Sequence, residues 1–316
     1  GYNLEDIARG IDEYVIRQPF GVFAWIAPFN FPWMVPLWFI PYAVATGNTY
    51  IVKPSSEVPF SMTKLFELID EVGFPPGVIN MVHGGREVVR AVLKHPDIKG
   101  ISFVGSVPVG RDIIYKEAAA HGKRVQAQCG AKNFFVVMPD AVVDRTVPSI
   151  MTSFYGNTGQ RCLSGANLVV VGEDDDFYKG LMEKVVNRAS RIRIGYGLDE
   201  SVQVGPLRSP DKKQRVLKYV EKGLEEGAKL VLDGRQFEIV GDYPDDCFLA
   251  PSIFEDVTTD MLIAKDEIFG PVMSVLRAKD LDEAIKMIND CTYGNAAMIF
   301  TSSGKASRKF QYEVKA

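Results

Sequence analysis

The chain has 316 residues and a net charge of −4, and 47% of its residues are hydrophobic and 24% charged, which is typical of a globular protein with two domains. The negative charge and the lack of a basic patch argue against a nucleic-acid-binding protein. The most apolar stretch, residues 21–44, is interrupted by prolines, so we predict a loop and a helix there rather than a membrane span.

Strand-like and helix-like segments alternate in the first part of the chain. We predict an edge strand over 11–18, whose apolar side chains favour pairing with another subunit. Further strands are predicted over 20–26, 49–53, 79–83 and 100–104, and helices over 61–72, 87–93 and 109–120. Because such alternation requires helical crossovers between parallel strands, we expect residues 20–123 to form an open α/β nucleotide-binding-like domain.

The second part of the chain continues this alternation. We predict strands over 134–138, 168–171, 273–276 and 296–300, and helices over 147–155, 177–189, 212–227 and 281–289. This pattern indicates a second α/β domain.

Cysteine and histidine usage bears on the compartment and on metal chemistry. The four cysteines lie far apart and form no Cys-x-x-Cys pair, which argues against a disulfide framework. The three histidines lack the spacing of metal ligands, so we expect no metal site. We therefore expect a reducing compartment, namely the cytoplasm, or the mitochondrial matrix if the source is a eukaryote.

Cys162 ends the stretch Gly-Asn-Thr-Gly-Gln-Arg-Cys over residues 156–162. A cysteine among small and polar residues, directly after Arg161, is better suited to be a nucleophile than a core residue. Nearby positive charge and helix-end amides would lower the pKa of its thiol. The alternative is an inert, buried cysteine.

Two segments of the first domain have the chemistry of a binding site. Asn30 lies between Pro28 and Pro32, and an amide held in so rigid a loop is suited to donate to a developing oxyanion. Lys53 ends a predicted strand, where open α/β sheets bind ligands, and could reach a ribose or a phosphate. The alternatives are an ordinary turn asparagine and a solvent-exposed lysine.

Two further segments contain glycine turns. Gly105 and Ser106 join a predicted strand to a helix, where glycine permits close backbone approach and helix amides attract phosphate. Glu267 precedes Ile-Phe-Gly-Pro, so its carboxylate could hold a ribose while Phe269 packs on a flat ring. The alternative for this second segment is a β-turn with a buried aromatic side chain.

Together and in this order, the five segments resemble the aldehyde dehydrogenase superfamily. The resemblance implies a Rossmann-like cofactor domain, an α/β catalytic domain and a small oligomerisation element. It implies that Cys162 is the nucleophile and that Asn30 and the Cys162 amide form an oxyanion hole. It also implies cofactor contacts by Ala27, Phe29, Lys53, Ser56, Glu57, Gly105, Ser106, Gly110, Glu267 and Phe269.

One departure from the family pattern concerns the general base. Most members carry Glu-Leu-Gly-Gly-Lys, whereas this chain has Gln-Cys-Gly-Ala-Lys, with Gln128 at the position of the base. An amide takes up no proton near neutral pH, so attack by water on a thioester should be slow. A different nucleophile is then needed.

That pattern resembles the coenzyme A-acylating branch of methylmalonate-semialdehyde dehydrogenases. The resemblance implies that Cys162 attacks the aldehyde, that hydride loss gives a thioester, that CO2 is lost, and that coenzyme A takes the acyl group. The products would be propionyl-CoA or acetyl-CoA. Arg161 would bind the substrate carboxylate as a two-pronged donor, although a structural or thiol-activating role is the alternative.

A second departure concerns the nicotinamide cofactor. The branch usually carries Lys-Pro-Ser-Glu, whereas this chain has Ser56 at the glutamate position and Glu57 one place later. A neutral serine could admit NADP, and Glu57 could still serve NAD if the loop shifts. We expect NAD and leave NADP open.

The resemblance divides the chain into an oligomerisation segment over 1–19, a cofactor domain over 20–129 and a catalytic domain over 130–309. Residues 310–316 would begin a return to the oligomerisation element, and family regions before and after the chain would be missing. We expect a homodimer or homotetramer that acts on small molecules. The alternatives are a non-acylating NADP-dependent dehydrogenase that releases a free acid, and a catalytically silent structural relative.

Overall fold

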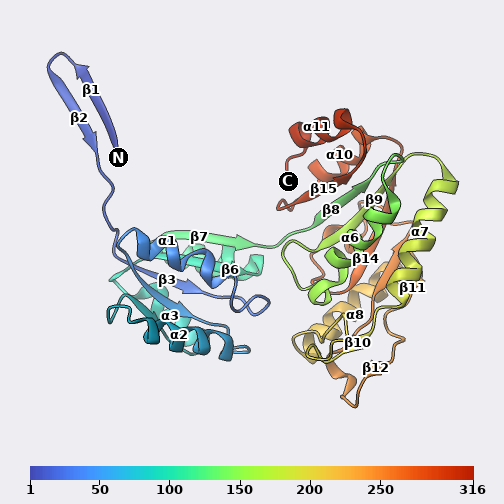
Figure 1. Ribbon diagram of the computed structural model, residues 1–316, viewed down its shortest axis with the longest axis horizontal. Helices are drawn as coiled ribbons and strands as arrows, with labels where there is room; N and C mark the ends of the chain where they lie inside the picture. Colours follow the sequence, from blue (N-terminus) through green and yellow to red (C-terminus); the bar gives the residue numbers. More distant parts are fainter. The chain divides into compact units, whose positions relative to one another are not determined.

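The computed structural model describes residues 1–316, which divide into two compact units, Gly1–Cys129 and Gly130–Ala316. Each unit contains one main sheet with helices on both faces, as predicted for an α/β protein (Figure 1). The units are described separately below. The functions that we predicted for the domains stay predictions.

The main sheet of the first unit is fully parallel and has the strand order β5-β4-β3-β6-β7. The strands are β3 (Val22–Ile26), β4 (Thr49–Lys53), β5 (Ile79–Met81), β6 (Ile98–Gly105) and β7 (Arg124–Cys129). The helices are α1 (Ile40–Ala45), α2 (Phe60–Val72), α3 (Arg86–Lys94), α4 (Val107–Val109) and α5 (Lys116–Ala120), with short turns η1 (Pro36–Trp38) and η2 (Gly110–Tyr115). The strand order reverses between β3 and β6, and open α/β sheets bind ligands outside the strand ends at such a point.

Alternate side chains of β3 build the two faces of this sheet. Trp25 joins a cluster with residues of α1 and α2, whereas Ala24 and Ile26 join a cluster with residues of α3 and α5. Both faces of β3 and β6 are therefore covered, which explains their nearly continuous apolar sequences.

The structure differs from prediction at two places in this unit. The single helix predicted over 109–120 is three pieces, with the π-helical turn η2 between α4 and α5. Gly110 begins that turn and packs against the Cys129 side chain, where any Cβ would collide with the sulfur. Strand β7 was not predicted because it lies at the sheet edge and alternates exposed polar residues with apolar ones.

The first residues of the chain form an antiparallel hairpin of β1 (Tyr2–Ala8) and β2 (Ile11–Val15). The strand predicted over 11–18 is thus present, and its partner within the chain is β1. Every residue of both strands is exposed, including Tyr14 and Ile7. Pairing with another subunit stays a prediction.

The main sheet of the second unit has the order β11-β13-β14-β9-β8-β15, in which only β11 is antiparallel to its neighbour. Its strands are β8 (Asn133–Val137), β9 (Gly165–Val171), β11 (Lys229–Leu232), β13 (Ser252–Glu255), β14 (Val272–Ala278) and β15 (Ala297–Phe300), and a small pair joins β10 (Ile194–Gly195) to β12 (Ile239–Val240). The helices are α6 (Val143–Tyr155), α7 (Asp175–Ser190), α8 (Pro210–Glu225), α9 (Leu262–Lys265), α10 (Leu281–Asn289) and α11 (Gly304–Glu313), with short turns η3 (Gly156–Gly159) and η4 (Asp245–Cys247).

Helices cover both faces of this second sheet (Figure 1). Phe135 and Val137 of β8 pack with residues of α6 and α7 on one face. Phe134 and Val136 pack with residues of α8, α10 and α11 on the other. The sheet is therefore a rigid support from which the loops at its strand ends project.

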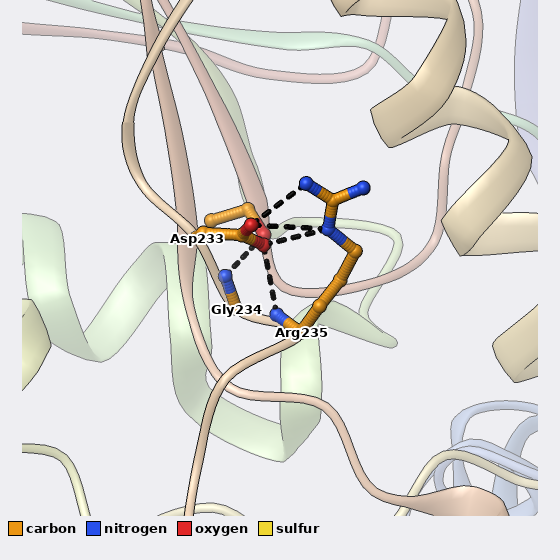
Figure 2. Close-up of polar contacts among 4 residues, drawn as sticks. Asp233, Gly234 and Arg235 are labelled. Atoms are coloured by element: carbon orange, nitrogen blue, oxygen red, sulfur yellow. Dashed lines mark hydrogen bonds and ion pairs between the residues drawn. The ribbon is translucent and has the colours of Figure 1, made fainter.

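A polar turn closes the connection after β11 (Figure 2). The Asp233 carboxylate accepts from the Arg235 backbone N–H at 3.0 Å and from its Nη2 at 2.7 Å. Between them, the Gly234 N–H donates to Ser252 Oγ at 3.0 Å, which ties the turn to β13.

None of the helices in the structure has the length and apolar character needed to cross a membrane.

Candidate active site

The loop that presents Cys162 runs from the end of α6 to the start of β9. Asn157, Thr158 and Gly159 all adopt left-handed backbone conformations, with φ of 52°, 57° and 68°. Such conformations are costly for residues other than glycine and persist where surrounding contacts enforce them. The Cys162 turn follows and is closed by a hydrogen bond from the Ser164 N–H to the Arg161 carbonyl at 3.1 Å.

Side chains tie this loop to the segment 205–208. Thr158 Oγ1 donates to the Gly205 carbonyl at 2.8 Å. The Gln160 amide donates to the Pro206 carbonyl at 3.3 Å and accepts from the Arg208 N–H at 3.0 Å. Because Thr158 and Gln160 are almost fully buried, these bonds are shielded from water and hold the strained loop in place.

The loop that presents Glu267 lies between α9 and β14. Phe269 adopts φ of 60°, so three of the five left-handed residues other than glycine lie on this loop or the Cys162 loop. Arg215 of α8 donates to the carbonyls of Glu267, at 2.8 Å, and of Ile268, at 3.3 Å. The Gly159 backbone packs against the Gly270 carbonyl, where a Cβ would collide, so the two loops are in direct contact.

These two loops and the start of β8 line one narrow cavity of about 20 Å³. Cys162, Glu267 and Phe269, which we predicted from well-separated segments, all line it. Lys132 and Asn133 contribute from β8 and the residue before it. The structure therefore brings together the predicted nucleophile and one predicted cofactor-binding carboxylate.

The Glu267 carboxylate accepts a hydrogen bond from the Ala131 N–H at 3.0 Å. Burial raises the pKa of Glu267, and this hydrogen bond, Arg215 and Lys132 partly oppose the rise. The carboxylate thus already has one partner within its own unit. Its contact with a ribose stays a prediction.

Lys132 lies directly beneath the Glu267 loop and is 3% exposed. Its ammonium donates to the carbonyls of Ile263, at 2.7 Å, and of Asp266, at 2.8 Å. Burial lowers its pKa to about 7, against weaker opposing effects of Cys291, Asp266 and Glu267. This lysine therefore anchors the end of α9 and so the position of Glu267.

The environment of Cys162 differs from the one that we predicted. Burial raises the pKa of its thiol, the backbone amides of Cys162 and Leu163 lower it, and Glu267 adds to the rise. The expectation of helix-end amides was wrong, because no helix begins at Cys162 and the amides of a turn face the sulfur instead.

Arg161 extends toward α6 and lines a second, larger cavity. Its Nη1 donates to the Thr152 carbonyl at 3.4 Å, and its guanidinium packs against Gly156. The cavity has a volume of about 820 Å³ and is also lined by Lys184, Arg188 and Arg191. Arg161 lines the Cys162 cavity as well, so its predicted contact with a substrate carboxylate stays a prediction.

The predicted site residues of the first unit cluster at strand ends. Ala27, Phe29 and Asn30 follow β3, Lys53 ends β4, and Gly105 and Ser106 end or follow β6. These are carboxyl ends of neighbouring parallel strands, where doubly wound sheets bind nucleotides.

Lys53 is 6% exposed and its Nζ donates to the Pro54 carbonyl at 2.6 Å. Burial lowers its pKa. The alternative of a solvent-exposed lysine was therefore wrong. Ser56 and Glu57 lie in the exposed turn that follows, and Gly110, four residues after Ser106, begins the π-helical turn η2.

Gln128 lies on the exposed edge strand β7. It lines a cavity of about 670 Å³ within the first unit, together with Gln126, Trp38, Tyr50 and Ser102. The side chain presents an amide to this cavity, and no carboxylate is among the lining residues.

Sequence reasoning missed several residues that hold the Cys162 and Glu267 loops, namely Lys132, Asn133, Arg215 and Asn295. Lys132 and Asn133 belong to a stretch that we used for the family resemblance, but we assigned them no role. Arg215 and Asn295 donate to backbone carbonyls that lie 52 and 133 residues away along the chain. Nothing in their local sequence indicates those partners.

The chain thus has the architecture of a two-domain α/β protein, in which a doubly wound parallel sheet is followed by a unit that presents a cysteine and a glutamate on touching loops. The chain belongs to the aldehyde dehydrogenase family, whose model matches residues 2–316. Malonate-semialdehyde dehydrogenase 1 of Geobacillus kaustophilus is 49% identical over 316 residues, which are 100% of this chain and 63% of that protein.

Solved structures agree with this assignment. A protein described as a methylmalonate-semialdehyde dehydrogenase from Sinorhizobium meliloti, complexed with NAD, matches with a TM-score of 0.94 and 42% identity, over 99% of this chain and 63% of that one. The methylmalonate-semialdehyde dehydrogenase of Oceanimonas doudoroffii matches with a TM-score of 0.94 and 37% identity, over 99% and 64%. The chain thus spans less than two thirds of the length of these relatives.

Proposed function

We propose that the protein is a coenzyme A-acylating dehydrogenase of malonate semialdehyde or methylmalonate semialdehyde. The observation that carries the proposal is the pairing of Cys162 with Glu267 in one cavity, in a chain that has Gln128 where most of the family has a carboxylate. The names of the relatives at 49% and 42% identity support the same substrate class.

The residues present fit a nicotinamide dinucleotide. Lys53 is a buried cation at the end of β4, and the Gly105–Ser106 turn ends β6 beside the point where the strand order reverses. Lys53, Ser106 and Glu267 would hold the dinucleotide, whose nicotinamide supplies a hydride acceptor when bound. NAD is our proposal because a relative is complexed with it, and the neutral Ser56 leaves NADP open.

The chain's own residues would then act in sequence. The Cys162 thiolate attacks the aldehyde carbon and forms a thiohemiacetal, while the Asn30 amide and the Cys162 N–H donate to the oxyanion. Loss of hydride leaves an acyl thioester on Cys162. The substrate carboxylate, bound by Arg161, leaves as CO2, and the carbon that held it takes up a proton. The thiol of coenzyme A then displaces Cys162 and releases propionyl-CoA or acetyl-CoA.

Steady-state assay of the full chain tests this proposal. We expect NAD reduction with either semialdehyde to depend on added coenzyme A and to yield acyl-CoA. Release of a free acid at the same rate without coenzyme A would contradict it and favour a hydrolytic dehydrogenase. No turnover under any of these conditions would favour a catalytically silent relative.

A second test uses Gln128→Glu, which places a carboxylate at the position of the missing base. We expect this variant to release more free acid relative to acyl-CoA, because a carboxylate can accept a proton from attacking water. Product ratios from chromatography give the measurement, and Gln126→Glu on the same face of β7 is a matched control. An unchanged ratio in Gln128→Glu would mean that Gln128 does not occupy the base position.

We further propose that the protein assembles as a homodimer or homotetramer through residues 1–19. The support is the hairpin β1–β2, whose apolar side chains Tyr2, Ile7 and Tyr14 are all more than half exposed. A two-stranded hairpin of this kind is marginally stable alone. Light scattering of the chain with and without residues 1–15 tests this, and equal masses would contradict it.

A further inference from the structure

The carbonyl oxygen of Cys162 accepts hydrogen bonds from two side-chain amides. Asn133 Nδ2, from the start of β8, and Asn295 Nδ2, from the loop before β15, both lie at 2.8 Å. Two donors saturate the lone pairs of this carbonyl. The peptide between Cys162 and Leu163 is therefore held from two separate elements of the second unit.

Asn133 uses the rest of its amide to fix the surroundings of this peptide. Its Nδ2 also donates to the Ser164 carbonyl at 2.7 Å, and its Oδ1 accepts from the Ala296 N–H at 3.2 Å. The side chain is 2% exposed. It therefore ties the Cys162 turn to the backbone next to Asn295. The positions of the two donors, Asn133 and Asn295, are thus fixed relative to each other.

The peptide that these amides hold also contributes the Leu163 N–H. A peptide unit is planar, so fixing its carbonyl oxygen also fixes the direction of its N–H. The Leu163 backbone amide is one of the two backbone amides that lower the pKa of the Cys162 thiol against the effect of burial. Hydrogen bonds to the carbonyl also polarise the peptide and strengthen its N–H as a donor.

We propose that Asn133 and Asn295 are positioning residues that aim the Leu163 N–H at the Cys162 sulfur and so favour the thiolate. The proposal rests on the proposed function, in which Cys162 is the nucleophile. The asparagines touch no reacting atom, and they act through the peptide that they hold.

The charged groups that face this cavity do not replace that effect. Glu267, from the loop before β14, disfavours the thiolate. Lys132 directs its ammonium to the carbonyls of Ile263 and Asp266, and Arg161 directs its guanidinium toward Thr152. The backbone amides of the turn are thus the groups that lower the pKa of the thiol against the effect of burial.

The test is the pH dependence of Cys162 alkylation by iodoacetamide in the full chain. The rate is read by mass spectrometry on the peptide that contains Cys162, and Cys247 in the same samples is an internal standard. The variant is Asn295→Ala, because Asn295 is exposed and its loss leaves the Asn133 bonds in place. We expect the midpoint for Cys162 to rise by up to about 1 pH unit, the limit that would be reached if the thiolate lost the whole of one hydrogen bond from the Leu163 N–H.

Asn295→Asp sharpens the result, because a carboxylate keeps the shape, loses the donor and adds negative charge. We expect its midpoint to rise further than that of Asn295→Ala. The matched control is Asn289→Ala, which also removes an asparagine that donates to a backbone carbonyl of the second unit, that of Glu313 at 2.9 Å. Its Cys162 midpoint should equal that of the parent chain.

A midpoint in Asn295→Ala within about 0.2 pH unit of the parent, in either direction, would overturn the proposal, since one lost donor should move it further. So would an equal rise in Asn289→Ala, which would indicate general loosening of the unit. A Cys162→Ala chain that kept its dehydrogenase activity would instead refute the proposed function, and the alkylation midpoints would still report on the asparagines.

Discussion

The Cys162 loop and the strand ends of the first unit are built in different ways. The Cys162 loop is strained and is held by side chains. Thr158 and Gln160 of the loop donate to carbonyls of the segment 205–208, and Asn133 of β8 donates to the Cys162 carbonyl. The strand ends of the first unit follow a regular parallel sheet, whose register sets where each strand ends. A reacting atom requires a fixed position within a fraction of an ångström, whereas a dinucleotide can be held by backbone at the ends of strands.

We expect Cys162→Ala to have the largest effect, and to affect the Cys162 loop and the first unit differently. We expect turnover to fall by about a thousandfold or more, because the only proposed nucleophile is lost. Binding of NAD, measured by calorimetry, should be close to that of the parent chain, because the substitution leaves the proposed dinucleotide contacts of the first unit unchanged. Residual activity above about a tenth of the parent would contradict the assignment of Cys162.

Gly159→Ala should disturb the loop without touching the sulfur. A Cβ at this position would collide with the Gly270 carbonyl, and the φ of 68° disfavours any residue with a side chain. We expect a loss of about 2 to 3 kcal/mol in the free energy of unfolding and a fall in kcat. Urea unfolding gives the measurement, and Gly180→Ala, at a helix position with open space around it, is the control.

Lys132→Met should loosen the Glu267 loop and change the pH dependence of stability. Burial lowers the pKa of Lys132 to about 7 in the folded chain, from its ordinary value of 10.5. Between these values the unfolded chain binds more protons, so the parent chain gains stability as pH rises through this window. The methionine variant lacks this gain.

Urea midpoints at pH 7 and pH 9 measure that difference. At pH 7 the variant leaves the carbonyls of Ile263 and Asp266 without their donor, which costs about 1 to 3 kcal/mol, while it also removes the burial of a cation. We expect the stability of the parent relative to the variant to increase from pH 7 to pH 9. A difference that is equal at both values would show that Lys132 titrates normally.

The smallest effect is expected at the turn after β11, which belongs to neither region. Arg235→Ala removes the ion pair with Asp233, which is partly exposed at both side chains. We expect a loss of less than about 1 kcal/mol in the free energy of unfolding and no change in activity. A change in kcat would show that this turn is coupled to the Cys162 and Glu267 loops.

The regular elements were predictable because their local sequence decides them. β4 and α10 have the predicted bounds, Thr49–Lys53 and Leu281–Asn289, since apolar periodicity and flanking turn residues set both ends. β7 was missed because an edge strand with exposed Gln126 and Gln128 lacks the apolar run of a buried parallel strand.

The candidate site was predictable in its reactive groups but not in its supports. Cys162 and Glu267 stand in short segments whose composition is unusual enough to be noticed. Asn133 and Asn295 bond a carbonyl that is 29 and 133 residues away along the chain. Only the pairing of β8 with β9 and of β8 with β15 creates those contacts, and no local pattern encodes such register.

The hairpin at the start of the chain has a separate consequence for how substitutions are tolerated. Residues 1–20 are all exposed, so no side chain there contributes to either folded core. A protease that cut after Ile16 would release the hairpin β1–β2 and leave the packing of both main sheets unchanged. Apart from residues that shape the hairpin turn, such as Gly10 with φ of 75° and Asp6, which accepts from the Gly10 N–H, constraint on these residues would come from molecules outside this chain.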